Sequence, residues 1–214
     1  MKIIDSIESY SSFKESILKG EKVALIPTMG ALHAGHASLI KQAQKECEHV
    51  IVSIFVNPIQ FNNSKDFENY PSDLKGDISF LESLNVSLLF NPSGKVVYPN
   101  GPKTKNYNLD NLDNKLEGLL RPGHFQGVAT VVDRLFDLLK PDRVYLGLKD
   151  YQQVQVIKKL ASIRAERPEI IGCRIIREDT GLAMSSRNSR LNSKKKNTDA
   201  AIMAIVPIKN VKAT

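Results

Sequence analysis

The chain has 214 residues, of which 42% are hydrophobic and 25% are charged. This balance is typical of a folded protein with one substantial core, and it excludes a chain that is disordered throughout. The formal net charge of +7 at pH 7 favours anionic partners, which include nucleic acids, anionic membranes and phosphorylated small molecules. Charge alone does not choose among them.

Apolar runs with strand character alternate along the chain with segments of helical period. Residues 93–123 are rich in Gly, Pro, Asn and Lys, and we predict that they form a long loop outside the core. Strands separated by helices predict a Rossmann-like α/β fold, in which a doubly wound, mainly parallel sheet is covered by helices on both faces. In chain order the predicted elements are strand 23–26, helix 36–48, strand 50–56, helix 74–84, strand 86–90, helix 125–139, strand 144–148, helix 150–166 and strand 170–176.

The cysteine content and the length of the apolar runs indicate the cellular compartment of the protein. Cys47 and Cys173 are the only two cysteines, and we interpret both as small buried hydrophobic residues, because neither belongs to a pair with zinc-ligand spacing. The longest apolar run, residues 51–56, is too short to cross a bilayer, and the first residues do not resemble a secretion signal. We therefore expect a cytoplasmic protein that has no membrane partner.

Four polar segments begin where predicted strands stop. They are residues 27–36, residues 57–61, residues 147–153 and the segment that ends at Arg187. In an open parallel sheet, ligands bind at the carboxyl ends of the strands. We therefore expect these four segments to line a single cleft.

The first polar segment, PTMGALHAGH at residues 27–36, brings His33 and His36 to the start of a predicted helix. Both imidazoles can face one side there, near the unpaired N–H groups and the positive end of the helix dipole. Gly30 and Gly35 let the backbone approach a ligand closely. The segment predicts phosphate binding rather than a metal site, since no third ligand is near in sequence. Two histidines without a function are the alternative.

The later polar segments supply the cations that a nucleotide requires. Lys149 follows a predicted strand and can neutralise phosphate charge during a transfer reaction. Arg187, with the hydroxyls of Ser185 and Ser186, suits phosphate oxygens, and Gly181 can act as a hinge. Each segment alone could be a solvated loop, but together with the two histidines they predict an adenylate-forming enzyme.

Five motifs together resemble those of the pantoate-beta-alanine ligase (pantothenate synthetase) family. This family belongs to the nucleotidylyltransferase superfamily, which includes class I aminoacyl-tRNA synthetases. The similarity covers most of residues 23–192, and five motifs in the expected order are far more specific than any one of them. The motifs are the histidine segment, FVNPIQF at 55–61, RPGHF at 121–125, GLKDYQQ at 147–153 and GLAMSSRN at 181–188.

The resemblance implies ATP-dependent condensation of pantoate with β-alanine to pantothenate, through a pantoyl adenylate and with release of AMP and pyrophosphate. It implies catalytic roles for His36, His33, Lys149 and Arg187, with His36 as proton donor, although an imidazolium that acts through its charge would look the same in sequence. It also implies that Gln60 and Gln153 bind pantoate and that Gln60 binds β-alanine. The implied ATP site comprises Met29, Gly30, Ala31, Leu32, His33, Ala34, Gly35, His36, Gly147, Leu148, Lys149, Asp150, Ile176, Met184, Ser185, Ser186 and Arg187.

The resemblance also implies partners. Mg²⁺ is expected with ATP, and Asp77 and Asp150 are candidates for ligands, although neither is assigned. The family resemblance implies a homodimer, and we expect no nucleic-acid partner. Two other functions stay open. One is a different small-molecule nucleotidylyltransferase, since the histidine and Ser-Ser-Arg motifs are shared across the superfamily. The other is a non-catalytic, RNA-binding relict, which the basic charge favours and the lack of aromatic residues interleaved with Lys or Arg disfavours.

The sequence departs from the family pattern at three places. Leu148 stands where the family usually has glutamate, and Ser72 stands where arginine is common. The chain ends at Thr214, whereas family members usually continue into a smaller C-terminal domain that covers the site. We therefore expect residues 1–192 to form the nucleotide- and pantoate-binding domain and residues 193–214 to be a divergent or truncated remnant of a largely absent lid.

Overall fold

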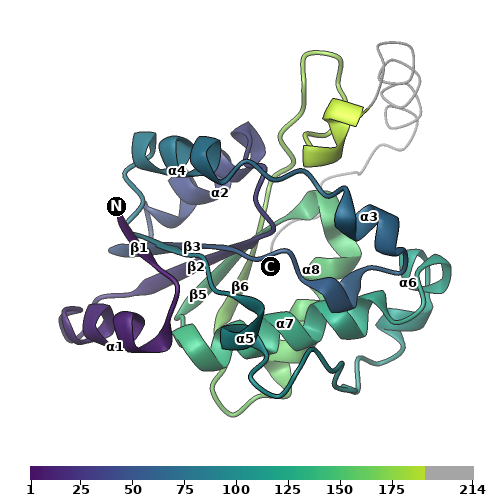
Figure 1. Cartoon of the computed structure of the whole chain (residues 1–214), viewed down its shortest axis with the longest axis horizontal. Coiled ribbons are helices and arrows are strands. Elements are labelled where there is room, and N and C mark those ends of the chain that lie inside the picture. Colours follow the sequence, from purple (N-terminus) through teal and green to yellow (C-terminus); the bar gives the residue numbers. More distant parts are fainter. Residues whose placement is uncertain (191–214) are drawn as a thin grey trace.

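The computed structural model describes residues 1–190, and the expected lid remnant at 193–214 lies outside the described residues. Six strands form one sheet in the order β1-β4-β3-β2-β5-β6, and every neighbouring pair is parallel (Figure 1). The predicted doubly wound α/β fold is thereby confirmed. The strands are β1 (Lys2–Ile4), β2 (Val23–Thr28), β3 (His49–Ile54), β4 (Leu88–Phe90), β5 (Arg143–Gly147) and β6 (Glu169–Cys173).

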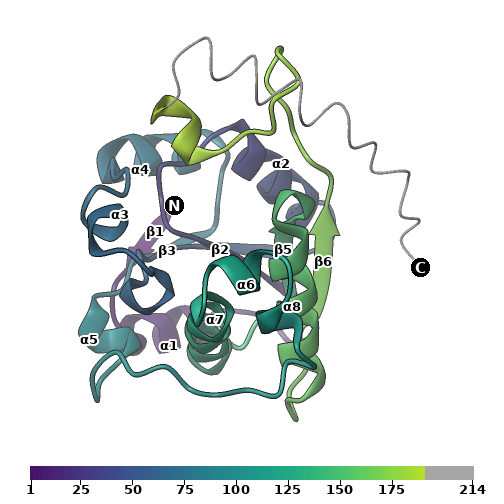
Figure 2. The same ribbon diagram turned by 90° about the vertical axis from the view of Figure 1, so that its right-hand side faces the viewer.

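Helices cover both faces of the sheet. Helices α2 and α4 lie on one face, and α1, α5, α7 and α8 lie on the other (Figures 1 and 2). None of the helices in residues 1–190 has the length and apolarity that a membrane crossing requires. The helices are α1 (Ile7–Glu15), α2 (Ala34–Ala43), α3 (Ser64–Glu68), α4 (Leu74–Ser83), α5 (Gly94–Val97), α6 (Glu117–Leu120), α7 (His124–Leu139) and α8 (Tyr151–Ser162), with 3₁₀ turns η1 (Pro58–Gln60), η2 (Leu112–Asn114), η3 (Leu148–Asp150) and η4 (Ser186–Arg190).

The central strand β2 is buried on both sides, which explains its continuous apolar run. Successive side chains of a strand point to opposite faces of the sheet. Val23 and Leu25 accordingly pack in the core layer beneath α1, α7 and α8. Ala24 and Ile26 pack in the other layer, with residues of α2 and α4. The chain leaves β2 toward β3 and β4 and later returns on its other side as β5 and β6, so the strand order reverses beside β2.

The predicted loop at residues 93–123 is wrong in part. This segment contains α5, η2 and α6, and it contributes Val97, Tyr98 and Leu109 to the core. Its helices have only three or four residues, too few for a helical period to appear in the sequence. Strand β1 was also missed, because Ile4 is the one buried side chain among its three residues.

Several element boundaries differ from the predicted ones. Strand β4 begins at Leu88 rather than residue 86, and β6 ends at Cys173 rather than residue 176. Helix α2 begins at Ala34, two residues early, and ends at Ala43, because the chain turns at residues 44–46 before it enters β3. Both cysteines are buried and unpaired, as predicted.

Helix α7 approaches η1 so closely that only a glycine fits between them. A Cβ atom on Gly127 would lie 2.3 Å from the carbonyl oxygen of Ile59 and 3.0 Å from Cα of Gln60. The carbonyl oxygen of Gly127 accepts a hydrogen bond from Asn57 Nδ2 at 3.2 Å. The contact therefore fixes the segment that follows β3 against α7.

We predict that Gly127→Ala lowers the free energy of unfolding by about 2 kcal/mol, because backbone atoms must move to admit the new methyl group. This cost exceeds the helix propensity gained, about 1 kcal/mol. The matched control is Gly94→Ala in α5, where a Cβ atom meets nothing within 4 Å. Urea denaturation should show the control unchanged or more stable, and equal stability of the two variants would contradict the close contact.

Candidate active site

A cleft of about 280 Å³ lies where the carboxyl ends of the central strands meet. All four polar segments contribute to its wall, so the predicted single cleft is present. The residues of the predicted site that line it are Met29, His33, Gly35, His36, Gln60, Gly147, Lys149, Asp150, Gln153, Ile176, Met184, Ser185, Ser186 and Arg187. Those placed outside its wall are Gly30, Ala31, Leu32, Ala34 and Leu148.

The two histidines cap helix α2. His33 is the N-cap residue, and its Nδ1 accepts a hydrogen bond from the Gly35 N–H at 3.1 Å. His36 Nδ1 accepts in turn from the His33 N–H at 3.2 Å. An Nδ1 atom that accepts carries no proton, so each neutral ring holds its proton on Nε2. The helix terminus thus fixes both rings as Nε2–H donors.

Burial keeps both rings neutral. The pKa of His36 is lowered to about 3 by burial, with the adjacent His33 and then Lys149 adding to the effect. Burial also lowers the pKa of His33, followed by the charge of Lys149. The two rings therefore offer neutral N–H groups to the cleft.

Asp77, from α4, stabilises the turn between β2 and α2 through hydrogen bonds to its backbone. Its carboxylate accepts from the Ala31 N–H at 2.9 Å and from the Leu32 N–H at 2.7 Å. Gly30 has φ +83°, and a Cβ atom on it would lie 2.9 Å from Asp77 Oδ2. Asp77 lies outside the cleft wall and both of its oxygens bind backbone. Of the two candidate Mg²⁺ ligands, therefore, Asp150 is the one that faces the cleft.

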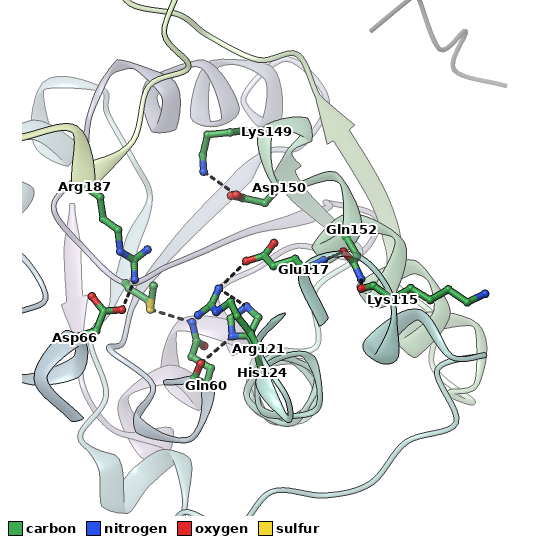
Figure 3. Close-up of polar contacts among 11 residues, drawn as sticks. Gln60, Asp66, Lys115, Glu117, Arg121, His124, Lys149, Asp150, Gln152 and Arg187 are labelled. Carbon is green, nitrogen blue, oxygen red and sulfur yellow. Dashed lines mark hydrogen bonds and ion pairs between the residues drawn. The ribbon is translucent and has the colours of Figure 1, made fainter. Parts of the chain in front are cut away.

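Lys149 lies in η3, directly after β5. Its Nζ atom is 2.7 Å from Asp150 Oδ1, and both side chains are partly open to solvent (Figure 3). The pair places a cation and a carboxylate on the same wall of the cleft. Within residues 1–190 we find no cluster of three or more His, Cys, Asp or Glu residues that could hold a metal ion unaided.

Arg187 lies across the cleft and contacts the segment around α3. Its Nη2 atom is 2.9 Å from Asp66 Oδ2 (Figure 3). Its guanidinium lies 5.4 Å from the ring centre of Tyr70. The neighbouring Ser186 Oγ donates to the Ala31 carbonyl at 3.0 Å. The Ser-Arg segment is thus joined both to the histidine turn and to α3.

Gln60 is buried and lines the cleft. Its Oε1 accepts from Asn57 Nδ2 at 3.0 Å, and its Nε2 lies 3.1 Å from Met29 Sδ. The hydroxyl of Tyr98 donates a hydrogen bond to Asn57 Oδ1 at 2.8 Å, which fixes the orientation of the Asn57 amide. Gln153 reaches the cleft from the first turn of α8. The two glutamines therefore line one cleft, although they come from different elements.

Several residues that line the cleft had no role predicted from the sequence. Arg121 and His124 belong to the RPGHF motif, and Glu117 precedes them in α6. The motif itself was the available signal, since it joins two basic side chains at the start of a long amphipathic helix. The other unassigned polar or charged residues in the wall include Tyr70 and Arg174.

Comparisons with known proteins agree on one family. The family model for pantoate-beta-alanine ligase matches residues 2–211. A pantothenate synthetase of Francisella tularensis subsp. novicida is 50% identical over 193 residues, which are 90% of this chain and 74% of that protein. The chain belongs to the pantoate-beta-alanine ligase family.

Solved structures of the family have the same fold. A pantoate-beta-alanine ligase from Francisella tularensis, crystallised with beta-gamma ATP and beta-alanine, superposes with a TM-score of 0.90 at 46% identity, over 100% of this chain and 82% of that one. The enzyme from Thermus thermophilus superposes with a TM-score of 0.86 at 39% identity, over 95% of this chain and 72% of that one. The expected family is thus confirmed.

The two departures from the family pattern have different surroundings. Leu148 is partly buried and packs against the core, where its Cδ2 atom is so close to Gly172 that a Cβ atom there would lie 2.9 Å away. Ser72 is exposed and lines a small second hollow together with Asp77. Leu148 therefore contributes to packing between β5 and β6 rather than to the cleft wall.

We predict that acid destabilises the protein through His36. The unfolded chain binds a proton at an ordinary histidine pKa of 6.5, whereas folded His36 binds one only near pH 3. Between these values a fall in pH favours the unfolded chain. Urea denaturation should show the loss between pH 7.5 and 5.5 to be about 1 kcal/mol smaller in His36→Gln than in the unaltered chain. Parallel pH profiles would contradict the buried neutral ring.

Proposed function

We propose that this chain condenses pantoate with β-alanine, using ATP and releasing AMP and pyrophosphate. One observation carries the proposal: the two histidines, Lys149, Arg187 and both glutamines, although far apart in sequence, line one cleft of about 280 Å³. The family relationship and the relative crystallised with beta-gamma ATP and beta-alanine support the same reaction.

In the first step a carboxylate oxygen of pantoate attacks the α-phosphorus of ATP, and the bond from that phosphorus to the pyrophosphate oxygen breaks. The products are pantoyl adenylate and pyrophosphate. No protein nucleophile is required, so the protein must position the reactants and stabilise charge. The Nε2–H groups of His33 and His36 can donate to phosphate oxygens at the N-terminus of α2, and Lys149 can follow the charge that develops on the departing pyrophosphate.

In the second step the amine nitrogen of β-alanine attacks the acyl carbon of the adenylate. The carbon–oxygen bond to AMP breaks, the nitrogen gives up a proton, and pantothenate and AMP leave. Gln60 and Gln153 can donate and accept hydrogen bonds at once, which suits the hydroxyl and carbonyl groups of the pantoyl moiety. The chain from Tyr98 through Asn57 to Gln60 holds one of these amides in a fixed orientation.

Mg²⁺ is proposed to enter the cleft with ATP. This ion is commonly held by one or two carboxylates together with substrate phosphates and water, so a dedicated protein cage is not needed. Asp150 fits such a site, because it is a half-exposed carboxylate in the cleft wall beside Lys149. When bound, the ion would neutralise charge on the phosphates.

The family relationship is also the basis for the proposed domain bounds and the proposed oligomeric state. Residues 1–192 would form the nucleotide- and pantoate-binding domain, and the chain would form a homodimer. Light scattering coupled to size-exclusion chromatography tests the assembly, and a mass equal to one chain would contradict it.

The function is tested by exchange of labelled pyrophosphate into ATP. Exchange that depends on pantoate, together with pantothenate formation when β-alanine is added, is the expected result. Equal exchange with another acid or a phosphoester would favour a different nucleotidylyltransferase. Absence of exchange together with salt-sensitive RNA binding would favour the non-catalytic relict.

We predict that Lys149→Ala lowers pantoate-dependent exchange by at least about a hundredfold, as expected for loss of a charge contact made in the transition state. The matched control is Lys158→Ala, which removes an exposed lysine from α8 outside the cleft. Circular dichroism should show that both variants fold. Exchange at the unaltered rate in Lys149→Ala would remove this lysine from the mechanism.

A further inference from the structure

A cation on the α6–α7 wall of the cleft has no part in the phosphate contacts described above. Arg121 ends α6, and its Nη1 atom lies 2.7 Å from Glu117 Oε1 and 3.0 Å from His124 Nε2. His124 Nδ1 lies 2.8 Å from the carbonyl oxygen of Gln60. A continuous chain of contacts thus leads from the guanidinium to the backbone of a proposed substrate-binding residue.

The contacts fix the protonation of His124. A guanidinium only donates, so His124 Nε2 must accept from Arg121. The ring proton is then on Nδ1, where it donates to the Gln60 carbonyl. Burial lowers the pKa of His124, which is consistent with this neutral ring. The buried imidazole therefore joins Nη1 of Arg121 to the backbone of Gln60 through two hydrogen bonds.

Arg121 retains donors for a ligand. Its contacts with Glu117 and His124 both engage Nη1, and among the side chains described, those of residues 1–188, neither Nη2 nor Nε has a hydrogen-bond or ion-pair partner. The side chain lines the cleft and is 31% exposed. Nη2 and Nε form one edge of the planar guanidinium, and this edge matches the two oxygens of a carboxylate.

The backbone around Arg121 is also held in place. Gln152 Nε2 donates to the carbonyl oxygens of Leu112 and Lys115 at 2.7 and 2.6 Å, and its Oε1 accepts from the Glu117 N–H at 3.0 Å. In Figure 3, Gln152 and Lys115 lie on one side of Glu117, and Arg121 and His124 lie on the other. A preorganised guanidinium loses little conformational entropy when it binds an anion.

The location of Arg121 in the cleft indicates which anion of the proposed reaction it binds. Figure 3 shows it beside Gln60 and His124, whereas Lys149 and Asp150 lie on another part of the wall. The phosphates have the α2 terminus and Lys149 as partners. The carboxylate of pantoate is the nucleophile, and it loses its charge when the adenylate forms. The carboxylate of β-alanine does not react and stays charged through both steps.

On the basis of the proposed function, we propose that Arg121 binds the carboxylate of β-alanine and that His124 is the residue that positions it. Glu117 balances part of the charge of Arg121, but it occupies only Nη1, and its side chain is 46% exposed, so water screens it. Arg174 also lines the cleft, yet it is exposed, and no hydrogen bond or ion pair with residues 1–188 holds its side chain.

The test measures the two half-reactions, adenylate formation and amide formation, separately in the variant Arg121→Gln. Pantoate-dependent pyrophosphate exchange should stay within about threefold of the unaltered enzyme, because β-alanine takes no part in it. The KM for β-alanine should rise about 30-fold or more, as for loss of a charge-assisted bidentate contact. Propylamine, which has the same chain length without a carboxylate, should react equally well in both enzymes. The preference for β-alanine over propylamine should therefore collapse.

Three further variants sharpen the result. Arg121→Lys should recover part of the preference, because an ammonium restores the charge without the fork. His124→Asn should raise the KM for β-alanine with little change in exchange, since it loosens Arg121. The matched control Lys115→Gln removes an exposed charge outside the cleft wall and should leave all three measurements unchanged.

Four outcomes would overturn the assignment. An unchanged KM for β-alanine in Arg121→Gln shows that this arginine does not bind the carboxylate. Loss of exchange in the same variant, when it is folded, moves Arg121 to the first half-reaction. Loss of the amine preference in Arg174→Gln instead gives the carboxylate to that residue. Absence of exchange in the unaltered enzyme removes the proposed function, and the Arg121 proposal with it.

Discussion

The cleft depends on the shared direction of the strands. Because β2 is hydrogen-bonded in parallel to both β3 and β5, and β5 in parallel to β6, the segments that follow these strands all emerge at one edge of the sheet. The reversal of strand order beside β2 leaves room between the segments that diverge there. Groups from residue 29 to residue 187 can therefore surround one ligand, although they are far apart in sequence.

The cleft combines neutral hydrogen-bond donors with four cationic side chains, three of which already have a carboxylate partner. Burial lowers the pKa of His33 and His36 and keeps both rings uncharged, so neither ring needs a counter-ion. Of the four Lys and Arg residues in the cleft wall, Lys149, Arg187 and Arg121 each contact a carboxylate that is 32–48% exposed. Such partly solvated pairs contribute little stability. An anionic substrate can therefore replace or share the carboxylates at modest cost.

Sequence patterns predicted the elements that carry a strong periodic signal. Residues 23–26 are buried on both faces, and a continuous apolar run shows this directly. The one buried residue of β1, Ile4, produces no such pattern. The same limit hid α6, whose exposed leucines and short length resemble a loop. For that reason Arg121 and His124 appeared in a motif without a role, even though the motif helped to place the chain in its family.

The sequence by itself determined the α/β class, the family and the identities of the groups that meet at the strand ends, since these depend on local periodicity and on motifs. Only the tertiary structure decided how those groups are used. It bound Asp77 to backbone N–H groups, placed the ring protons of the histidines, and joined Arg121 to Glu117 and His124 in the cleft wall. Such outcomes depend on burial and on hydrogen bonds between distant residues, which local sequence patterns do not encode.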